Sequence, residues 1–473
     1  MQSKFDLIAS KAKQDKKLKF SVLIHHINEE NLLQCYRELN RNKACGIDDV
    51  TYEEYGRELE ANIKLLVQKL RAKEYRPKPV RRVYIPKHGK EDEKRALGIP
   101  TLEDKLVQLM IKKILEPIFE ANFRECSHGF RPGKSCHTAI KSLNQTIMKS
   151  DVKYIVEVDI RKFFDSVQHY WLLRCIEERV SDPNMIWLIK RFLKAGVIEA
   201  NAYRPSEVGT PQGGVISPLL ANIYLHYVLD LWFDKVVVPK ARDQMQLIRY
   251  CDDWVVCCNN KKDAEEFLTQ LTDRLYKFKL EVNPDKTKII KFGRQSWKQW
   301  KRGANRAGSF TFLGFTHYCG TSRQGGFSVM HKTAKQNLQR MLKGANAWLK
   351  KIRNMLPLKE WWKTLKAKLL GHYRYFGVSG NYRCISRFYD RIRRMVFKWI
   401  NRRSQKKSMN WQQFEAYNNW DPLPQPKIYC KLYEISLPFG NASLKSPVWE
   451  NHKQGSVRVS ITMKQKLVKL NKE

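Results

Sequence analysis

The chain has 473 residues, 42% of them hydrophobic, which is enough to bury a large core in roughly two to four domains. Lys and Arg number 88 against 47 Asp and Glu, and the net charge of +41 predicts a nucleic-acid partner, because each neutralised phosphate releases counterions. No run approaches the roughly 20 apolar residues of a membrane span, and the N-terminus lacks the apolar region of a secretory signal. We therefore expect a cytoplasmic protein that is bound to nucleic acid and is neither secreted nor held in a membrane.

The 11 cysteines are scattered, and no two of them form a CxxC pair. This pattern argues against a zinc ribbon and against a disulfide scaffold. We expect reduced cysteines that act as small apolar side chains.

The N-terminal part of the chain predicts helices followed by a hairpin. Residues 1–75 carry apolar side chains at helical spacing. Residues 80–101 then predict a short strand, a charged loop and a Gly-Ile-Pro stop. Thr101 and Asp104 form a helix-start pattern, and the amphipathic spacing continues for several turns.

The middle of the chain predicts alternating strands and helices. Residues 154–160 indicate a strand by their β-branched content, and two helical segments follow. Residues 208–234 combine a glycine-rich turn with a long apolar helix. LIRYC (247–251) and WVVCC (254–258) predict two strands that meet at the Asp252–Asp253 pair.

Beyond that pair we expect a helix at 261–282, strands at 286–293 and 309–319, and an exposed basic loop at 291–308. Residues 331–410 have helical spacing throughout and carry 22 Lys and Arg against two acids. We expect most of the aromatic residues there to be core, with Lys and Arg on an outer face that contacts the phosphates of a duplex or a folded RNA. These aromatic residues are Trp348, Trp361, Trp362, Tyr373, Tyr375, Phe376, Phe388, Tyr389, Phe397 and Trp399.

Three acids carry the chemistry. Asp159 ends one predicted strand, and Asp252 and Asp253 lie between two others. An Asp at a strand end is often a helix N-cap, and an Asp-Asp pair in a hairpin is commonly a turn. If the strands are neighbours in one sheet, the carboxylates converge and repel one another. Mg²⁺ removes this penalty, and two such ions about 4 Å apart serve the in-line phosphoryl transfer of polymerases and nucleases.

Seven motifs, in family order over about residues 80 to 320, resemble those of group II intron reverse transcriptases. The most specific is YCDD (250–253), which matches the YxDD box of these enzymes. The basic helical segment resembles their thumb, or maturase X domain. The other six motifs are RRVYIPKHGKEDEKRALGIPTLEDKLVQ (81–108), ECSHGFRPGKSCHTAI (125–140), DIRKFFDSV (159–167), TPQGGVISPLLANIYL (210–225), LEVNPDKTKII (280–290) and FLGF (312–315).

The resemblance implies an α+β fold of the right-hand polymerase type, with fingers, a palm built on an antiparallel sheet, and an α-helical thumb. It divides the chain into an N-terminal helical extension (1–79), fingers and palm (80–320), a thumb or X domain (321–415) and a tail (416–473). The tail carries no metal-ligand cluster, so we expect no C-terminal endonuclease domain.

The resemblance also implies a catalytic site. Asp159 and Asp252 would hold two Mg²⁺ ions, for which Mn²⁺ can substitute, and the carbonyl of Ile160 would be a further ligand. Asp253 either completes the catalytic triad or serves as a turn residue that orients Asp252.

Five residues would bind the incoming dNTP. Phe164 holds the position at which the family places an aromatic ring that excludes a 2′-hydroxyl, and the alternative for it is core packing. Lys87 and Arg95 would grip the triphosphate, and the alternative for both is a solvated charged loop. Gln212 would lie near the sugar and base, and Lys286 would assist the departing pyrophosphate.

Five more residues would contact primer and template. Tyr250 would support the primer terminus, and Phe312, Leu313 and Gly314 of the FLGF motif would pack against the primer backbone. Cys251 stands where the family commonly has Ala, near the nascent base pair. We expect a tolerated variation there rather than a catalytic thiol.

Three functions follow from this pattern. The first is an RNA-directed DNA polymerase encoded by a group II intron, whose partners are an RNA template, a DNA primer, dNTPs and the intron RNA that it helps to splice and to retrohome. The second is a stand-alone relative in DNA repair or phage defence. The third is a splicing-only RNA-binding maturase, against which the intact acids count. The sequence carries no indication of oligomeric state.

Overall fold

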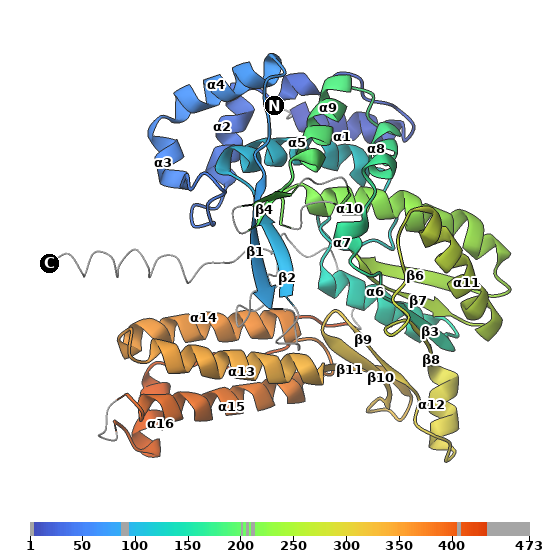
Figure 1. Ribbon diagram of the computed structural model, residues 1–473. Helices are drawn as coiled ribbons and strands as arrows, with labels where there is room; N and C mark the ends of the chain where they lie inside the picture. The colour runs from blue at the N-terminus through green and yellow to red at the C-terminus, as the bar shows by residue number, and fades with distance from the viewer. Residues whose placement is uncertain are drawn as a thin grey trace.

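The computed structural model describes residues 4–86, 94–199, 202–204, 208–209, 213–403 and 408–432 (Figure 1). Within these ranges helices alternate with three small sheets in which nearly all strand pairs are antiparallel. The fold is therefore α+β, as expected.

Four α-helices precede the first strand, as predicted for residues 1–75. The four helices are α1 (Lys4–Gln14), α2 (Glu29–Glu38), α3 (Tyr52–Arg57) and α4 (Leu59–Arg71). Two of them, α1 and α2, pack against the long helix α5 (Leu102–Glu120), α4 packs against α2, and α3 packs against α4. The Thr101 hydroxyl caps α5 by accepting a hydrogen bond from the Asp104 backbone N–H at 3.2 Å, so the predicted helix start is confirmed.

The first sheet is built on a long hairpin that extends away from these helices (Figure 1). β1 (Val80–Pro86) and β2 (Lys94–Ile99) pair antiparallel, which confirms the predicted hairpin. β1 also pairs in parallel with β4 (Val197–Glu199), and β4 pairs with β5 (Ala202–Arg204).

The central sheet has the strand order β6-β7-β3-β8, and every pair in it is antiparallel. Helices α6 (Cys136–Lys149) and α11 (Lys261–Lys277) pack against it, and apolar side chains are buried on both of its faces. Coverage on both faces explains why β7 is a continuous apolar run after its first residue, Asp253. The strands are β3 (Tyr154–Val158), β6 (Met245–Tyr250), β7 (Asp253–Cys258) and β8 (Lys288–Lys291).

The connection between β3 and β6 contains three α-helices, one more than predicted, and then the predicted apolar helix. That apolar helix is interrupted: α10 (Ser217–Leu225) continues as π-helical turns at His226–Asp230 and Phe233–Val237. Such π-helical turns often accompany functional positions. The three helices are α7 (Phe163–Ser166), α8 (His169–Glu177) and α9 (Pro183–Lys194).

The expectation of a single strand at 309–319 is wrong. The chain reverses at Leu313 (φ 48°) and Gly314 (φ 82°), and two adjacent left-handed residues are the signature of a tight hairpin turn. The resulting antiparallel sheet has the order β11-β10-β9. Its strands are β9 (Ser309–Phe312), β10 (Phe315–Thr321) and β11 (Phe327–Thr333).

The expectation of a basic loop at 291–308 is also wrong, because this segment contains helix α12 (Arg294–Lys301). The helix is anchored by Trp297, whose ring lies 6.0 Å from that of Phe327 and whose indole N–H donates to the Thr321 hydroxyl at 3.2 Å.

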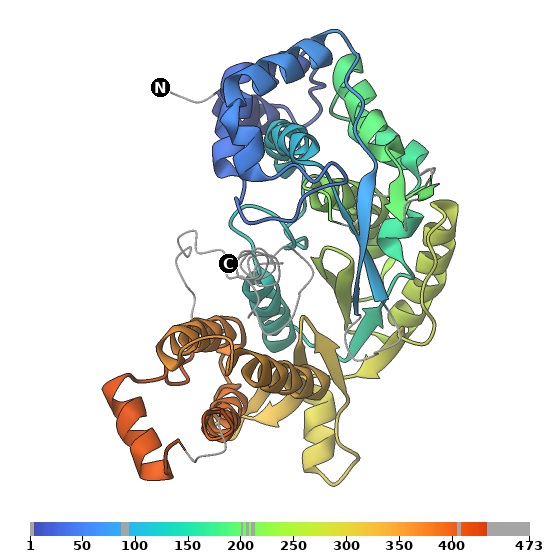
Figure 2. The ribbon, with the colours of Figure 1, turned by 60° about the vertical axis from the view of Figure 1, so that its left-hand side comes forward.

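The basic segment folds as a bundle of long helices, set apart from the central sheet in both ribbon views (Figure 2). Seven of its ten aromatic residues are buried, and Trp348, Tyr375 and Phe397 pack partly buried against the same core, which confirms that these aromatic residues form the core. The helices are α13 (Lys335–Ile352), α14 (Leu358–Phe376), α15 (Tyr382–Ile400) and α16 (Trp411–Trp420).

All 11 cysteines lie in described ranges. Eight are buried and three are half-buried, as expected for small apolar side chains. A search of the described helices finds none that is long and apolar enough to cross a membrane.

Candidate active site

The three predicted acids come together at one end of the central sheet. Asp159 directly follows β3, and Asp253 begins β7. Val158 pairs with Trp254 in the antiparallel ladder, so Asp159 and Asp253 occupy the next position along it. Asp252 lies in the two-residue turn that joins β6 to β7.

The other residue of this turn, Cys251, has an unusual backbone. Its φ is 56°, which is uncommon for a residue with a side chain, and it is 3% exposed. Gly129 packs on it so closely that a Cβ at Gly129 would lie 2.6 Å from the Cys251 amide nitrogen. Tyr250, next to the turn, is half-buried beside Phe130, with ring centroids 5.9 Å apart. The predicted contacts of Tyr250 and Cys251 with a duplex stay predictions.

Asp159 has two side-chain partners from the segment before β8. Lys286 Nζ lies 3.1 Å from Asp159 Oδ2, and Asn283 Nδ2 donates to the same oxygen at 3.0 Å. The Asn283 backbone N–H also donates to the Asp159 carbonyl at 2.8 Å. The lysine predicted to act on pyrophosphate therefore contacts a predicted metal ligand. Sequence reasoning missed Asn283, although the Asn-Pro-Asp turn in which it lies was a visible signal.

A fourth carboxylate, Glu157, lies two residues before Asp159 and therefore on the same face of β3. It pairs across the ladder with Lys288, and the Lys288 Nζ to Glu157 Oε2 distance is 3.2 Å. Burial raises the pKa of Glu157, Lys288 lowers it, and the nearby Asp159 and Asp253 raise it further. Two lysines around β8 thus balance part of the negative charge gathered at this end of the sheet.

The donor set suits a hard divalent cation. Carboxylate and carbonyl oxygens are the ligands that Mg²⁺ prefers, and the two lysines balance only part of the negative charge of the cluster. Among the described residues, no group of three or more His, Cys, Asp or Glu side chains is already arranged around one metal position. Asp159, Asp252, Asp253 and the carbonyl of Ile160 therefore stay predicted ligands. Ile160 is held in place by an isolated bridge to Val282.

Two of the predicted nucleotide contacts, Lys87 and Gln212, lie outside the described residues. Arg95 is described in its backbone, which pairs with Ile85 in the β1–β2 hairpin. Phe164 lies in α7, half-buried, with its ring 5.3 Å from that of Phe163 in an edge-to-face contact.

Two glycines, Gly209 and Gly213, pack closely on α7 and on β2. Gly209 (φ 92°) packs on α7, where a Cβ would lie 3.0 Å from the Phe164 carbonyl oxygen. Gly213 (φ 118°) packs on β2, where a Cβ would lie 2.6 Å from the Gly98 carbonyl oxygen. Because the four steps from Gly209 to Gly213 span at most about 14 Å, α7 and β2 line one region of the molecule.

The β9–β10 turn, which contains residues predicted to contact the primer, is docked on the helical bundle. The Tyr375 hydroxyl donates to the Leu313 carbonyl at 3.2 Å, and the Ala334 N–H donates to the Gly314 carbonyl at 3.0 Å. The side chain of Phe312 is buried in the core, so its predicted contact with a primer would run through the backbone of the turn.

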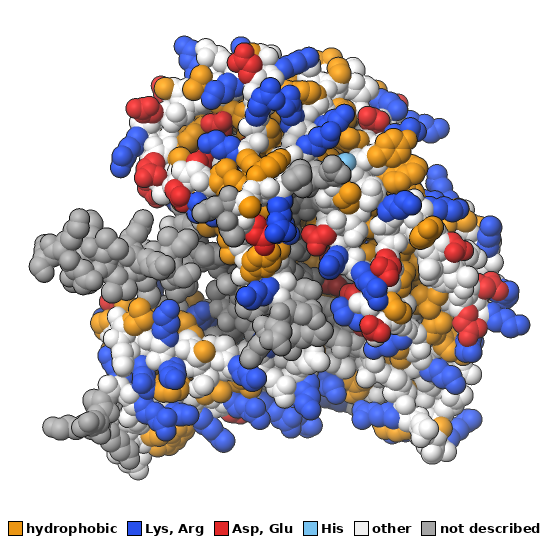
Figure 3. All heavy atoms as spheres, in the orientation of Figure 1, with side chains coloured by type: hydrophobic (Ala, Val, Ile, Leu, Met, Phe, Trp, Pro, Cys, Tyr) orange, Lys and Arg blue, Asp and Glu red, His pale blue; other side chains and the backbone are white. Residues whose placement is uncertain are grey.

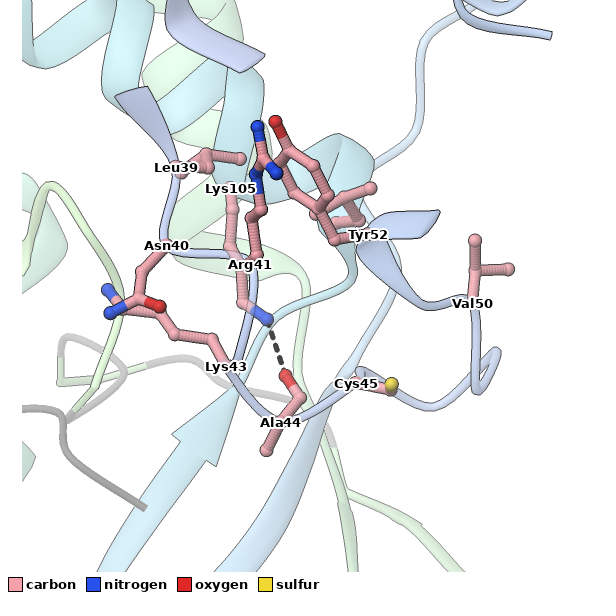
Figure 4. Close-up of a pocket in the computed structure, with 10 residues that line it drawn as sticks. Leu39, Asn40, Arg41, Lys43, Ala44, Cys45, Val50, Tyr52 and Lys105 are labelled. Atoms are coloured by element: carbon pink, nitrogen blue, oxygen red, sulfur yellow. Dashed lines mark hydrogen bonds between the residues drawn. The ribbon is translucent and has the colours of Figure 1, made fainter. Parts of the chain in front are cut away.

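A separate pocket, indicated by no sequence motif, lies between residues 39–52 and helix α5 (Figure 4). The buried Lys105 donates to the Ala44 carbonyl at 2.7 Å, and Arg41 lies over the Tyr52 ring at 5.6 Å. Burial lowers the pKa of Lys105 to about 8.

Comparison with known proteins places the acids within a recognised region. Residues 85–317 match the family model of reverse transcriptase (RNA-dependent DNA polymerase). The chain is 44% identical over 194 residues to the group II intron-encoded protein LtrA of Lactococcus lactis, covering 40% of this chain and 31% of LtrA. It is 33% identical over 274 residues to protein YkfC of Escherichia coli, covering 52% of this chain and 71% of YkfC.

The similarity extends to a plant protein. The nuclear intron maturase 4, mitochondrial, of Arabidopsis thaliana is 33% identical over 139 residues, covering 29% of this chain and 17% of that protein. The chain thus spans about a third of the length of LtrA and a smaller part of the plant maturase.

Proposed function

Because the chain belongs to the group II intron family of reverse transcriptases and maturases, we propose that it is an RNA-directed DNA polymerase that extends a DNA primer on an RNA template with dNTPs. One observation carries the proposal. Asp159 and the Asp252–Asp253 pair reach the same end of a sheet that is covered on both faces, inside the region matched by the family model. A rigid sheet end that presents carboxylates is suited to hold metal ions for phosphoryl transfer.

In this proposal Asp159 and Asp252 hold two Mg²⁺ ions, with Asp253 and the Ile160 carbonyl in support. The bound ions would activate the primer 3′-hydroxyl and stabilise the charge that develops on the transferred phosphate. Lys286, whose side chain is 64% exposed, is free to turn from Asp159 toward the departing pyrophosphate. Phe164 excludes a 2′-hydroxyl and so selects dNTPs.

The proposal assigns the architecture of a right hand. The central sheet would be the palm, and the β1–β2 hairpin with the N-terminal helices would be the fingers. Helices α13 to α15 would be the thumb, which the β9–β10 turn connects to the palm. The boundaries at residues 1–79, 80–320, 321–415 and 416–473 are proposed on the same basis.

An intron RNA is the proposed second partner. Lys and Arg side chains gather over the helical bundle in the lower part of Figure 3, as expected for a surface that contacts phosphates. Relatives named as an intron-encoded protein and an intron maturase favour this partner over a stand-alone role in repair or defence. We place the protein in a cytoplasmic ribonucleoprotein.

Primer extension tests the catalytic proposal. The purified protein with Mg²⁺ should extend a DNA primer on an RNA template, and Asp252→Ala should lower the rate at least about 100-fold, or about 2.7 kcal/mol of transition-state stabilisation. Asp273→Ala is the matched control, because Asp273 is an exposed acid on α11. If the unmodified protein extends the primer no better than Asp252→Ala, the polymerase proposal fails.

A further inference from the structure

A fully buried ion pair lies directly behind the turn that carries Asp252. Arg249, on β6, donates from Nε and Nη2 to the two carboxylate oxygens of Asp230 at 2.8 and 2.5 Å. Both side chains are 0% exposed. Removing two charges from water costs about as much as their attraction returns, so a buried pair adds little net stability. Net stability alone therefore does not explain why a buried ion pair lies at this position.

The third guanidinium nitrogen, Nη1, contacts the Cys251–Asp252 turn. Arg249 Nη1 donates to the Cys251 carbonyl at 3.2 Å and to Asn222 Oδ1 at 3.0 Å. The Cys251 carbonyl belongs to the same peptide plane as the Asp252 nitrogen. Holding this carbonyl therefore fixes the orientation of the peptide from which the Asp252 side chain projects.

The same turn is held from a second side by residues 126–129. The Arg249 backbone N–H donates to the Cys126 carbonyl at 2.7 Å, and the His128 N–H donates to the Arg249 carbonyl at 2.8 Å. Gly129 then packs on the Cys251 amide, and its own carbonyl accepts a hydrogen bond from Asn222 Nδ2 at 2.6 Å. Asn222 thus contacts both the Arg249 guanidinium and the 126–129 segment, the two groups that hold the turn.

The carboxylate that pairs with Arg249 comes from the π-helical turn that interrupts the apolar helix after α10. Asp230 is the last residue of the π-helical turn that follows α10, whereas Asn222 lies within α10 itself. Two residues eight positions apart on one helical segment thereby converge on a single guanidinium. Only arginine has a planar fork that can bind a carboxylate with two donors and still reach a carbonyl and an amide.

We propose that Arg249, oriented by Asp230 and Asn222, is a positioning residue that holds the strained Cys251–Asp252 turn in its catalytic conformation. This inference rests on the proposed polymerase function. It assigns to these three residues a role that does not require contact with nucleotide or nucleic acid.

The test compares Arg249→Lys with Arg179→Lys. Arg179 is a matched control, since it is 2% exposed and donates to the Leu18 carbonyl at 2.9 Å and to the Asp15 carbonyl at 3.2 Å. We expect Arg249→Lys to lower kcat for primer extension 10- to 100-fold and to leave the KM for dNTP within twofold. Arg179→Lys should leave kcat per folded molecule within twofold.

A second measurement is independent of activity. Amide hydrogen exchange of the peptide spanning 248–254, measured without metal, should accelerate at least tenfold in Arg249→Lys and remain unchanged in Arg179→Lys. If Arg249→Lys does not fold, Asn222→Ala replaces it, because this variant leaves no buried charge unpaired. Its expected effects are a three- to tenfold loss of kcat and a matching acceleration of exchange.

The outcomes separate the two proposals. A kcat within twofold together with unchanged exchange in the folded variant overturns the positioning role. Absence of primer extension by the unmodified protein overturns the polymerase proposal instead, while the exchange comparison still decides whether Arg249 holds the turn.

Discussion

Cys251 is the most constrained single residue of the candidate site. Its backbone is left-handed, its side chain is buried, and Gly129 packs closely against its amide. A β-branched side chain is especially unfavourable in the left-handed region, because its second Cβ substituent meets the neighbouring backbone. We therefore expect the requirement at this position to be small size rather than a thiol.

Two substitutions at Cys251 separate size from chemistry. Cys251→Ala should keep the rate of primer extension within about threefold, whereas Cys251→Val should lower it at least about tenfold and lower the free energy of unfolding by about 1–3 kcal/mol. Cys257→Val is the control, because Cys257 is equally buried but lies in β7, where Val is favoured. Steady-state kinetics and denaturant unfolding measure both effects. Complete loss of activity in Cys251→Ala would assign a chemical role to the thiol.

The residues found from the sequence belong to local patterns, whereas the residues that were missed depend on contacts with distant parts of the chain. Asp159 and Asp252 lie in a pattern of acids between apolar strands, which is visible along the chain. Asn283 and Arg249 act through partners that folding alone brings near, such as Asp159, which is 124 positions from Asn283. No local spacing encodes such a contact, although the Asn-Pro-Asp sequence marks Asn283 as a turn residue.

At the level of elements, α15 carries a single basic stripe. Its exposed cations recur at intervals of three or four residues and so lie on one face of the helix, while Ile385, Phe388, Ile392 and Val396 are buried on the other. Asp390 is the one acid within the helix. The stripe consists of Arg383, Arg387, Arg391, Arg394 and Lys398.

Neutralising part of this stripe should weaken RNA binding without affecting the chemistry. Arg387→Gln combined with Arg394→Gln should lower the affinity for a structured intron RNA about tenfold near 0.1 M salt. The slope of log affinity against log salt concentration should become shallower by the equivalent of about one to two phosphate contacts. Lys262→Gln combined with Lys277→Gln removes the same charge from α11 and should have little effect. Filter binding over a series of salt concentrations measures the affinity and its salt dependence for both double variants. Equal losses in the two double variants would indicate net charge rather than the stripe.

Elements with strong periodicity were predicted, and elements without it were not. The bundle helices have apolar side chains at helical spacing over many turns, and the structure confirms them. The β9–β10 turn was missed because Leu313 adopts a left-handed conformation without a turn-forming side chain. Helix α12 was missed because its composition is that of a basic loop, and its anchoring contact of Trp297 with Phe327 is formed between distant residues.

At the level of the whole molecule, buried histidines make stability depend on pH. Burial lowers the pKa of His128, His226 and His331 to about 4 and that of His372 to about 3, and it also lowers the pKa of His317. All five are therefore neutral in the folded protein near neutral pH. Once the pH falls below the ordinary histidine pKa of about 6.5, the unfolded chain binds more protons than the folded one, so stability declines.

The free energy of unfolding should fall between about pH 6.5 and pH 4 by up to about 1.4 kcal/mol per pH unit for each histidine. His372, stacked on Phe388 with ring centroids 3.8 Å apart, is the best residue to replace. Urea unfolding of His372→Leu from pH 7.5 to 4.5 should give a shallower slope than the unmodified protein. His25→Leu, at an exposed position, should keep the original slope. If the free energy of unfolding changed with pH identically in all three proteins, His372 would not contribute to the pH dependence.

The strand order of the central sheet has a consequence for synthesis of the chain. β6 and β7 form a local hairpin, but β3 lies between β7 and β8, and Ile155 pairs with both Cys257 and Ile290. At roughly 5–20 residues per second, β8 leaves the ribosome on the order of ten seconds after β3. Until β7 emerges, β3 is an unpaired apolar strand, and until β8 emerges it keeps one open edge, which is the kind of edge that favours aggregation. The nascent chain is therefore most vulnerable before its second half has emerged.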